Sequence, residues 1–67
     1  MTTHAAPIKI TDAQGNLIGK VQQIRRNGRR LWSALGKIEG RYVEVAVSDT
    51  RQDAESDVRT MWLLFNI

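Results

Sequence analysis

Cysteine is absent from this 67-residue chain, and histidine occurs once, as His4. The sequence therefore offers no disulfide, no thiolate zinc site and no Cys–His pair for nucleophilic catalysis. Proline also occurs once, as Pro7, and no stretch approaches the roughly 20 consecutive apolar residues that span a bilayer. The amino terminus lacks the basic flank and apolar run of a signal peptide, so we expect a cytoplasmic protein that does not interact with membranes.

Motifs for catalysis and cofactor binding are missing as well. The sequence contains no P-loop, no dinucleotide-binding fingerprint and no zinc-ligand spacing. Asp53 and Asp57 are four residues apart, but no histidine or cysteine lies near them, which is typical of a solvated helix face. Ser33 and Ser48 have no histidine partner in any motif. We therefore expect a protein that is not an enzyme and that binds no metal, no cofactor and no small-molecule substrate.

The residues that are present predict one small folded unit. Hydrophobic residues make up 42% of the sequence and charged residues 25%, a balance typical of globular rather than disordered chains. We expect residues 1–6 to form a flexible tail, because they are small or polar and show no apolar periodicity. Residues 7–67 then form a single domain. At this length one core supplies only about 3–5 kcal/mol of net stability.

Alternation of apolar and polar residues predicts four strands, over residues 8–11, 17–26, 30–35 and 41–48. Residues 12–16 form the first turn, and Asn27 with Gly28 supplies the two positive φ angles of a tight type I′ hairpin. A glycine-bounded turn is expected over residues 36–40. In the last strand the sequence predicts one buried face, formed by Val43, Val45 and Val47, with Tyr42, Glu44 and Ala46 pointing away. In residues 17–26, Gly19 and Val21 share one face and Ile18 and Lys20 the other, and the pattern does not show which is buried.

After Asp49 the apolar period changes from two to about 3.6, which predicts an amphipathic helix. Asp49 or Thr50 is expected to cap its first turn. Its apolar face consists of Ala54, Val58, Met61, Trp62 and Phe65. The sequence therefore predicts an α+β fold of order ββββα, in which an antiparallel sheet of three to four strands packs against one C-terminal helix.

Charge is distributed unevenly along the chain, although the net charge is only +3. Residues 20–41 contain seven lysine and arginine side chains and one acidic residue, Glu39, whereas acidic residues outnumber basic ones from residue 42 onward. Four arginines flank the Asn27–Gly28 turn. Such a basic block indicates a surface with a preferred partner, of which nucleic acid is the commonest. The alternative is that these charges keep an exposed hairpin soluble and unpaired.

The pattern of residues 21–62 resembles the N-terminal arm-binding domains of tyrosine recombinases and, more distantly, the plant ethylene-response-factor DNA-binding domain. The resemblance is carried by Arg-Arg-Asn-Gly-Arg-Arg at residues 25–30, by Trp-Ser-Ala at 32–34 and by Asp-Thr-Arg-Gln-Asp-Ala-Glu at 49–55. In those domains a three-stranded sheet lies in the DNA major groove and the helix packs behind it. The resemblance therefore implies nucleic-acid contacts from Arg25, Arg26, Arg29, Arg30, Trp32 and Lys37.

Two functions follow from these observations. The first is a small DNA-binding accessory or regulatory protein of mobile-element origin that contacts duplex DNA through its basic hairpin, with RNA as an alternative partner. Trp32 would then stack on a base, or it would pack in the core. The second is a protein-interaction module, an adaptor or inhibitor, that uses the apolar C-terminus or the acidic helix face. Exposure of the C-terminal residues would favour a homodimer or another protein partner, and the interface would comprise Trp62, Leu63, Leu64 and Ile67.

Overall fold

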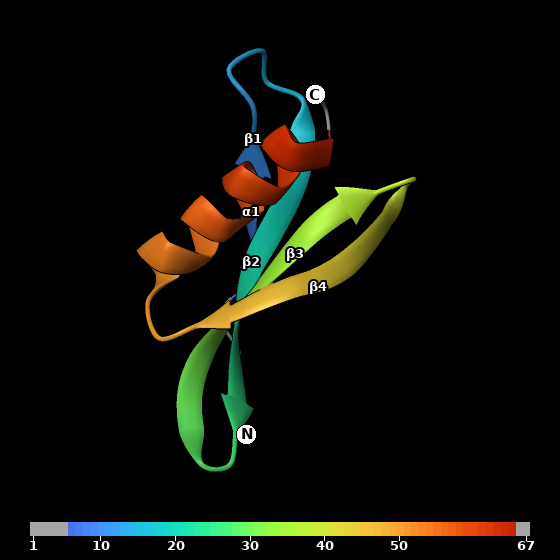
Figure 1. Ribbon diagram of the computed structural model, residues 1–67. Coiled ribbons are helices and arrows are strands. Elements are labelled where there is room, and N and C mark those ends of the chain that lie inside the picture. Colours follow the sequence, from blue (N-terminus) through green and yellow to red (C-terminus); the bar gives the residue numbers. More distant parts are fainter. Residues whose placement is uncertain (1–5, 66–67) are drawn as a thin grey trace.

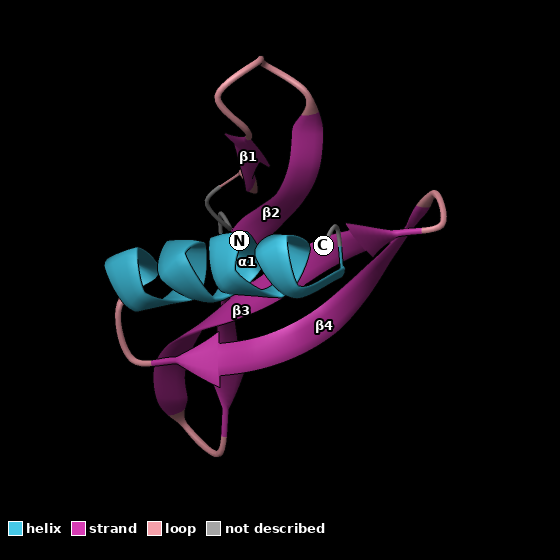
Figure 2. Cartoon of the chain, turned by 45° about the horizontal axis from the view of Figure 1, so that its top comes forward, coloured by secondary structure: helices cyan, strands magenta, loops and turns pink. Residues whose placement is uncertain are grey.

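The computed structural model describes residues 6–65 and shows a four-stranded antiparallel sheet covered on one face by a single helix (Figures 1 and 2). The strands follow one another in the sheet in chain order, and the helix comes last. The elements are β1 (Ile8–Thr11), β2 (Leu17–Arg26), β3 (Arg29–Ile38), β4 (Arg41–Ser48) and α1 (Arg51–Phe65). The predicted α+β fold is confirmed, with four strands. Within residues 6–65 no helix is long and apolar enough to cross a membrane.

The hairpin turns use the residues that such turns require. Asn27 and Gly28 both have positive φ, 52° and 77°, as a two-residue type I′ turn demands. The turn between β3 and β4 was predicted over residues 36–40, and this prediction is wrong. Strand β3 continues to Ile38, and the turn consists only of Glu39 and Gly40, with φ angles of 51° and 78°. Gly36 is a strand residue buried beneath the helix, so tertiary packing outweighs its tendency to break strands.

A β-bulge in β4 changes the predicted buried face of that strand: Val45 packs against the core as predicted, but Val43 and Val47 do not. The register has one extra residue, Val45, between the pairs Ala34–Ala46 and Leu35–Glu44. An extra residue reverses the alternation of side chains beyond it. Ala46 therefore packs against the core, and Val47 shares the opposite face with Ser33. Val43, which was also expected in the core, is 44% exposed.

A second bulge explains the position of Ile18. The register of β1 and β2 changes after Ile10, which pairs with Gly19, so Ile18 is the extra residue of β2. Ile18 is 3% exposed and belongs to the core, although alternation placed it with Lys20 on the opposite face. The bulge thus brings one more isoleucine into the core of a sheet that has only one covered face.

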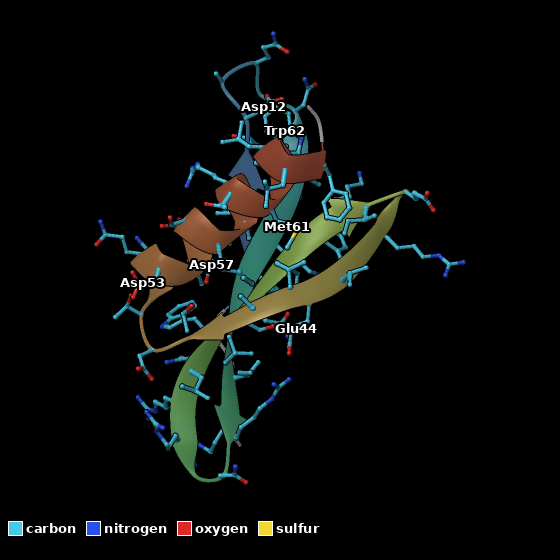
Figure 3. All side chains as sticks on the ribbon, viewed as in Figure 1. Asp12, Glu44, Asp53, Asp57, Met61 and Trp62 are labelled. Carbon is cyan, nitrogen blue, oxygen red and sulfur yellow. The ribbon has the colours of Figure 1, made fainter. Side chains whose placement is uncertain are left out.

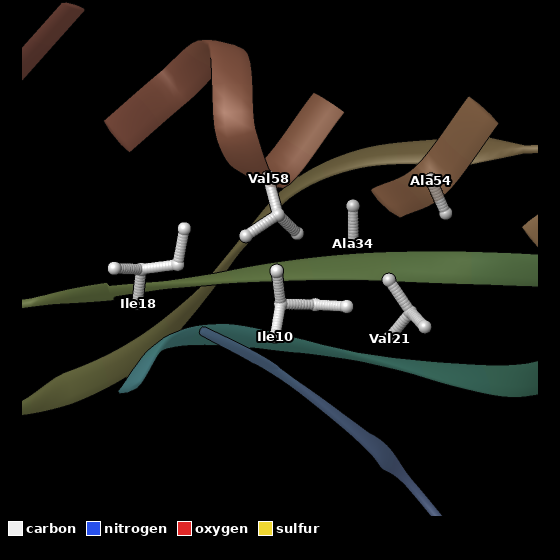
Figure 4. Close-up of a cluster of buried hydrophobic side chains, with 6 residues drawn as sticks. All are labelled: Ile10, Ile18, Val21, Ala34, Ala54 and Val58. Atoms are coloured by element: carbon white, nitrogen blue, oxygen red, sulfur yellow. The ribbon is translucent and has the colours of Figure 1, made fainter. Parts of the chain in front are cut away.

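The core lies between the sheet and α1 (Figure 4). Two of its six buried apolar side chains come from the helix, and the others come from β1, β2 and β3; they are Ile10, Ile18, Val21, Ala34, Ala54 and Val58. The sequence pattern does not show which face of β2 is buried. In the structure it is the face that carries Val21. Trp32 and Trp62 are half-buried and pack against this cluster.

The first turn of α1 is capped by Thr50. Its Oγ1 accepts a hydrogen bond from the backbone N–H of Asp53 at 3.1 Å, while Asp49, the other predicted cap, pairs with Arg29. We expect Thr50→Ala to lower the free energy of unfolding by about 1 kcal/mol, because the N–H loses its acceptor. Thr60→Ala, at an exposed position inside the same helix, is the matched control and should not destabilise the protein. Urea unfolding of both variants measures the difference, and equal losses would contradict the capping role.

Candidate nucleic-acid interface

The end of the β2–β3 hairpin is a free two-stranded ribbon. β4 pairs with β3 only as far as Trp32, and β1 pairs with β2 only as far as Val21. Among the described residues, 24–31 therefore pair only with one another and have no neighbouring strand on either side. This ribbon extends away from the helix and from the rest of the sheet, at one end of a molecule that measures 40 × 20 × 19 Å (Figure 1). Residues 25–30 are all exposed.

The four arginines of the ribbon form two cross-strand pairs. Arg25 lies opposite Arg30, and Arg26 lies opposite Arg29. Because side chains alternate between the faces of a strand, each pair occupies one face of the ribbon. Like charges directly opposite each other destabilise a sheet, so these pairs do not serve the stability of the hairpin. Figure 3 shows the long side chains spreading from both sides of the ribbon.

Acidic residues from outside the ribbon neutralise one of the two pairs. Arg26 Nη2 lies 2.9 Å from Glu44 Oε2, and Arg29 Nη2 lies 3.0 Å from Asp49 Oδ1. No local pattern in the sequence indicates these two carboxylates as arginine partners. Their positions follow from the pairing of β4 beside β3, which brings the acidic residues of β4 and of the following turn toward the base of the ribbon.

The other pair keeps its charge. Within residues 6–65, Arg25 and Arg30 form no ion pair. They share the face that carries Val21 farther along β2, which is the side of the sheet on which α1 packs. The ribbon therefore presents two adjacent, exposed guanidinium groups on one face and two partnered ones on the other.

Glu44 connects the partnered face to the buried part of the sheet (Figure 3). Its Oε2 accepts a hydrogen bond of 2.7 Å from the hydroxyl of Ser33, a residue only 1% exposed. This hydrogen bond is the main reason that the pKa of Glu44 lies below its ordinary value of 4.5. Burial opposes it with the next largest effect, and the hydrogen bond and charge of Arg26 lower the pKa further. The ionised carboxylate thus satisfies the Ser33 hydroxyl and holds Arg26.

The lowered pKa of Glu44 predicts a dependence of stability on pH. Because the folded state binds this proton less tightly than the unfolded state, the contribution of Glu44 is fully present above about pH 4.5 and is lost as the pH falls through its lower folded value. We expect Glu44→Gln to be less stable than wild type at neutral pH and to approach it in acid. Thermal unfolding of both proteins at several pH values measures this, and a constant difference between them would contradict it.

The two remaining predicted contacts lie elsewhere. Trp32 is half-buried and packs against the core, at the base of the ribbon. Lys37 is exposed but belongs to the other end of β3, about 24 Å from Arg30 at roughly 3.4 Å per residue. The structure therefore brings the four arginines together and separates them from Lys37.

The predicted protein interface lies at the end of α1, remote from the ribbon (Figure 1). Leu63 and Leu64 are 60% and 63% exposed, whereas Trp62 is half-buried against the core. Phe65, expected on the apolar face of the helix, is 64% exposed. Ile67 lies outside the described residues.

No group of three or more histidine, cysteine, aspartate or glutamate side chains with the geometry to hold a metal ion occurs in the part of the chain that the structure describes. Comparisons with protein-family models, with curated proteins and with solved structures found no match.

Proposed function

We propose that this protein binds duplex DNA through the basic ribbon, as a small accessory or regulatory protein of mobile-element origin. The observation that carries the proposal is the Arg25–Arg30 pair, two exposed arginines at directly opposite positions that form no ion pair within residues 6–65. Adjacent like charges are costly unless an anion lies between or above them. Successive phosphates of a nucleic-acid backbone provide such anions, and the guanidinium group matches their geometry with two hydrogen bonds.

The shape of the hairpin supports duplex DNA as the partner. A two-stranded ribbon fits the major groove, which is about 12 Å wide, and arginines at its tip reach both phosphates and guanine edges. The arm-binding domains that the sequence resembles dock through the sheet face opposite the helix. In this protein that face carries the half-buried Ile24, Leu31, Leu35 and Val47 together with Lys20, Lys37 and the ion-paired Arg26 and Arg29. Arg25 and Arg30 lie on the other face at the tip, so we propose that the ribbon tip makes the main contact.

Fluorescence anisotropy of a labelled random-sequence duplex, titrated with the protein at two salt concentrations, tests the proposal. We expect a dissociation constant on the order of micromolar that rises steeply with salt, because phosphate contacts release counterions. A single-stranded DNA and an RNA duplex, titrated in parallel, separate duplex DNA from the RNA alternative. Absence of binding at low salt would overturn the proposal.

Exposure of Leu63 and Leu64 supports a second candidate function, protein interaction. With Phe65 they place three large apolar side chains in contact with water in consecutive positions, which is typical of a surface that another chain covers. Burying all three side chains in each of two chains would give roughly 5–10 kcal/mol before the cost of association, enough for a reversible complex. This surface and the ribbon lie at opposite ends of the molecule, so both functions are compatible.

A further inference from the structure

The end of α1 carries a pocket beside its exposed apolar side chains. The pocket lies between the β1–β2 turn and the last turns of the helix and has a volume of about 170 Å³. Ile18, Trp62 and Leu63 supply its large apolar wall, and Ala13 lies at the turn. A closed cavity of about 150 Å³ with a similar lining holds one benzene ring, so the pocket has the size of a single aromatic side chain.

The charged side chains around the pocket, Asp12 and Arg59, do not indicate a polar ligand. The carboxylate of Asp12 already accepts hydrogen bonds from the backbone N–H groups of Gln14 and Asn16, at 2.9 and 2.8 Å. Arg59 is exposed at the other side of the pocket. The chemistry of the pocket is therefore that of an apolar site with one charge of each sign near its rim.

We propose that this pocket receives Phe65 of a second copy of the chain, and that Phe65 of the first copy enters the pocket of the second. A projecting apolar side chain and an apolar pocket at the same end of one molecule are what a two-fold interface needs, because each copy then contributes both halves. Charge favours the same occupant. Residues 60–65 include no charged side chain, and the two charged residues that line the pocket, Asp12 and Arg59, have opposite signs. Two chains of net charge +3 can therefore bring these ends together with little like-charge repulsion among the described residues.

This dimer rests on the second proposed function, protein interaction, and names a second copy of the chain as the partner. It does not depend on DNA binding. Because the ribbon is at the other end of the molecule, both basic ribbons stay accessible in the dimer (Figure 1). A two-fold dimer of this kind would carry one arginine pair at each of its two far ends.

Sedimentation equilibrium over a micromolar to millimolar concentration series, without DNA, tests the dimer. Two variants act independently: Phe65→Ser removes the projecting side chain, and Ala13→Leu fills the pocket from an exposed turn position. Each should weaken dimerisation by about 10-fold or more. Val43→Thr changes an apolar side chain of similar exposure on β4 and is the control, which should dimerise as wild type does.

Circular dichroism of each variant establishes that it is folded. A wild-type chain that stays monomeric throughout the series, or a dimer that survives either Phe65→Ser or Ala13→Leu, would overturn the proposal. Because the samples contain no nucleic acid, failure of the DNA-binding proposal would appear only in the anisotropy titration and would leave this result unaffected.

Discussion

Replacement of Gly19 by alanine is expected to leave a large fraction of the protein unfolded at room temperature. Gly19 lies in β2 beneath the helix, and a Cβ atom there would overlap the carbonyl oxygen of Leu35 and lie 2.6 Å from Cγ1 of Val58. The Leu35 oxygen belongs to the β2–β3 pairing and Val58 is fully buried, so neither can move cheaply. We expect a loss of about 3 kcal/mol or more, which is most of the stability of a domain of this size.

Gly36→Ala is the matched control, because Gly36 lies directly opposite Gly19 in the sheet. A Cβ atom at Gly36 would meet only the side chains of Val45 and Met61, at 3.5 and 3.9 Å, which are ordinary van der Waals distances. We expect this variant to stay within about 1 kcal/mol of wild type. Urea unfolding followed by tryptophan fluorescence measures both, and similar stabilities of the two variants would show that the helix does not require the glycine in β2.

The sequence predicts the parts of the fold that depend on neighbouring residues, but not those that depend on contacts between distant segments. The strands, the Asn27–Gly28 turn and the helix follow from local periodicity and turn chemistry, which act over a few residues. Glycine is required at position 19 by the neighbouring strand and by the helix that packs on it, and no local pattern reveals those contacts. The bulges at Ile18 and Val45 are likewise properties of strand pairing. The core membership of Ile18 and Ala46 could therefore not be read from alternation alone.

For the candidate site, the sequence predicted the arginine cluster but not its division. Alternation along a strand separates Arg25 from Arg26, yet the register and the turn determine which arginines face each other. The partners Glu44 and Asp49 are about 20 residues away in the chain, so their ion pairs with Arg26 and Arg29 depend on the placement of β4. The sequence also could not show whether Trp32 lies in the core or at the surface, because that depends on how the strands and the helix pack.

The division of the arginines predicts unequal effects of two double substitutions on DNA binding. In Arg25→Ala/Arg30→Ala the unpartnered guanidinium groups are lost, and we expect the affinity to fall by roughly 10- to 100-fold near 0.1 M salt. The slope of log K against log salt should decrease by about 2, because each lost phosphate contact accounts for about 1. Neither side chain makes an ion pair in the described chain, so the thermal stability should not decrease.

Arg26→Ala/Arg29→Ala removes the same two charges from the opposite face of the same ribbon and is the matched comparison. Its arginines already pair with Glu44 and Asp49, so a phosphate must displace a carboxylate to bind them. We therefore expect a smaller loss of affinity and a smaller change in slope than for the first variant.

If both variants lost affinity equally, net charge rather than the unpartnered pair would govern binding. If Arg25→Ala/Arg30→Ala bound as wild type does, the ribbon tip would not be the DNA-binding surface. The two ribbon arginines that form no ion pair within residues 6–65 would then contribute nothing to binding.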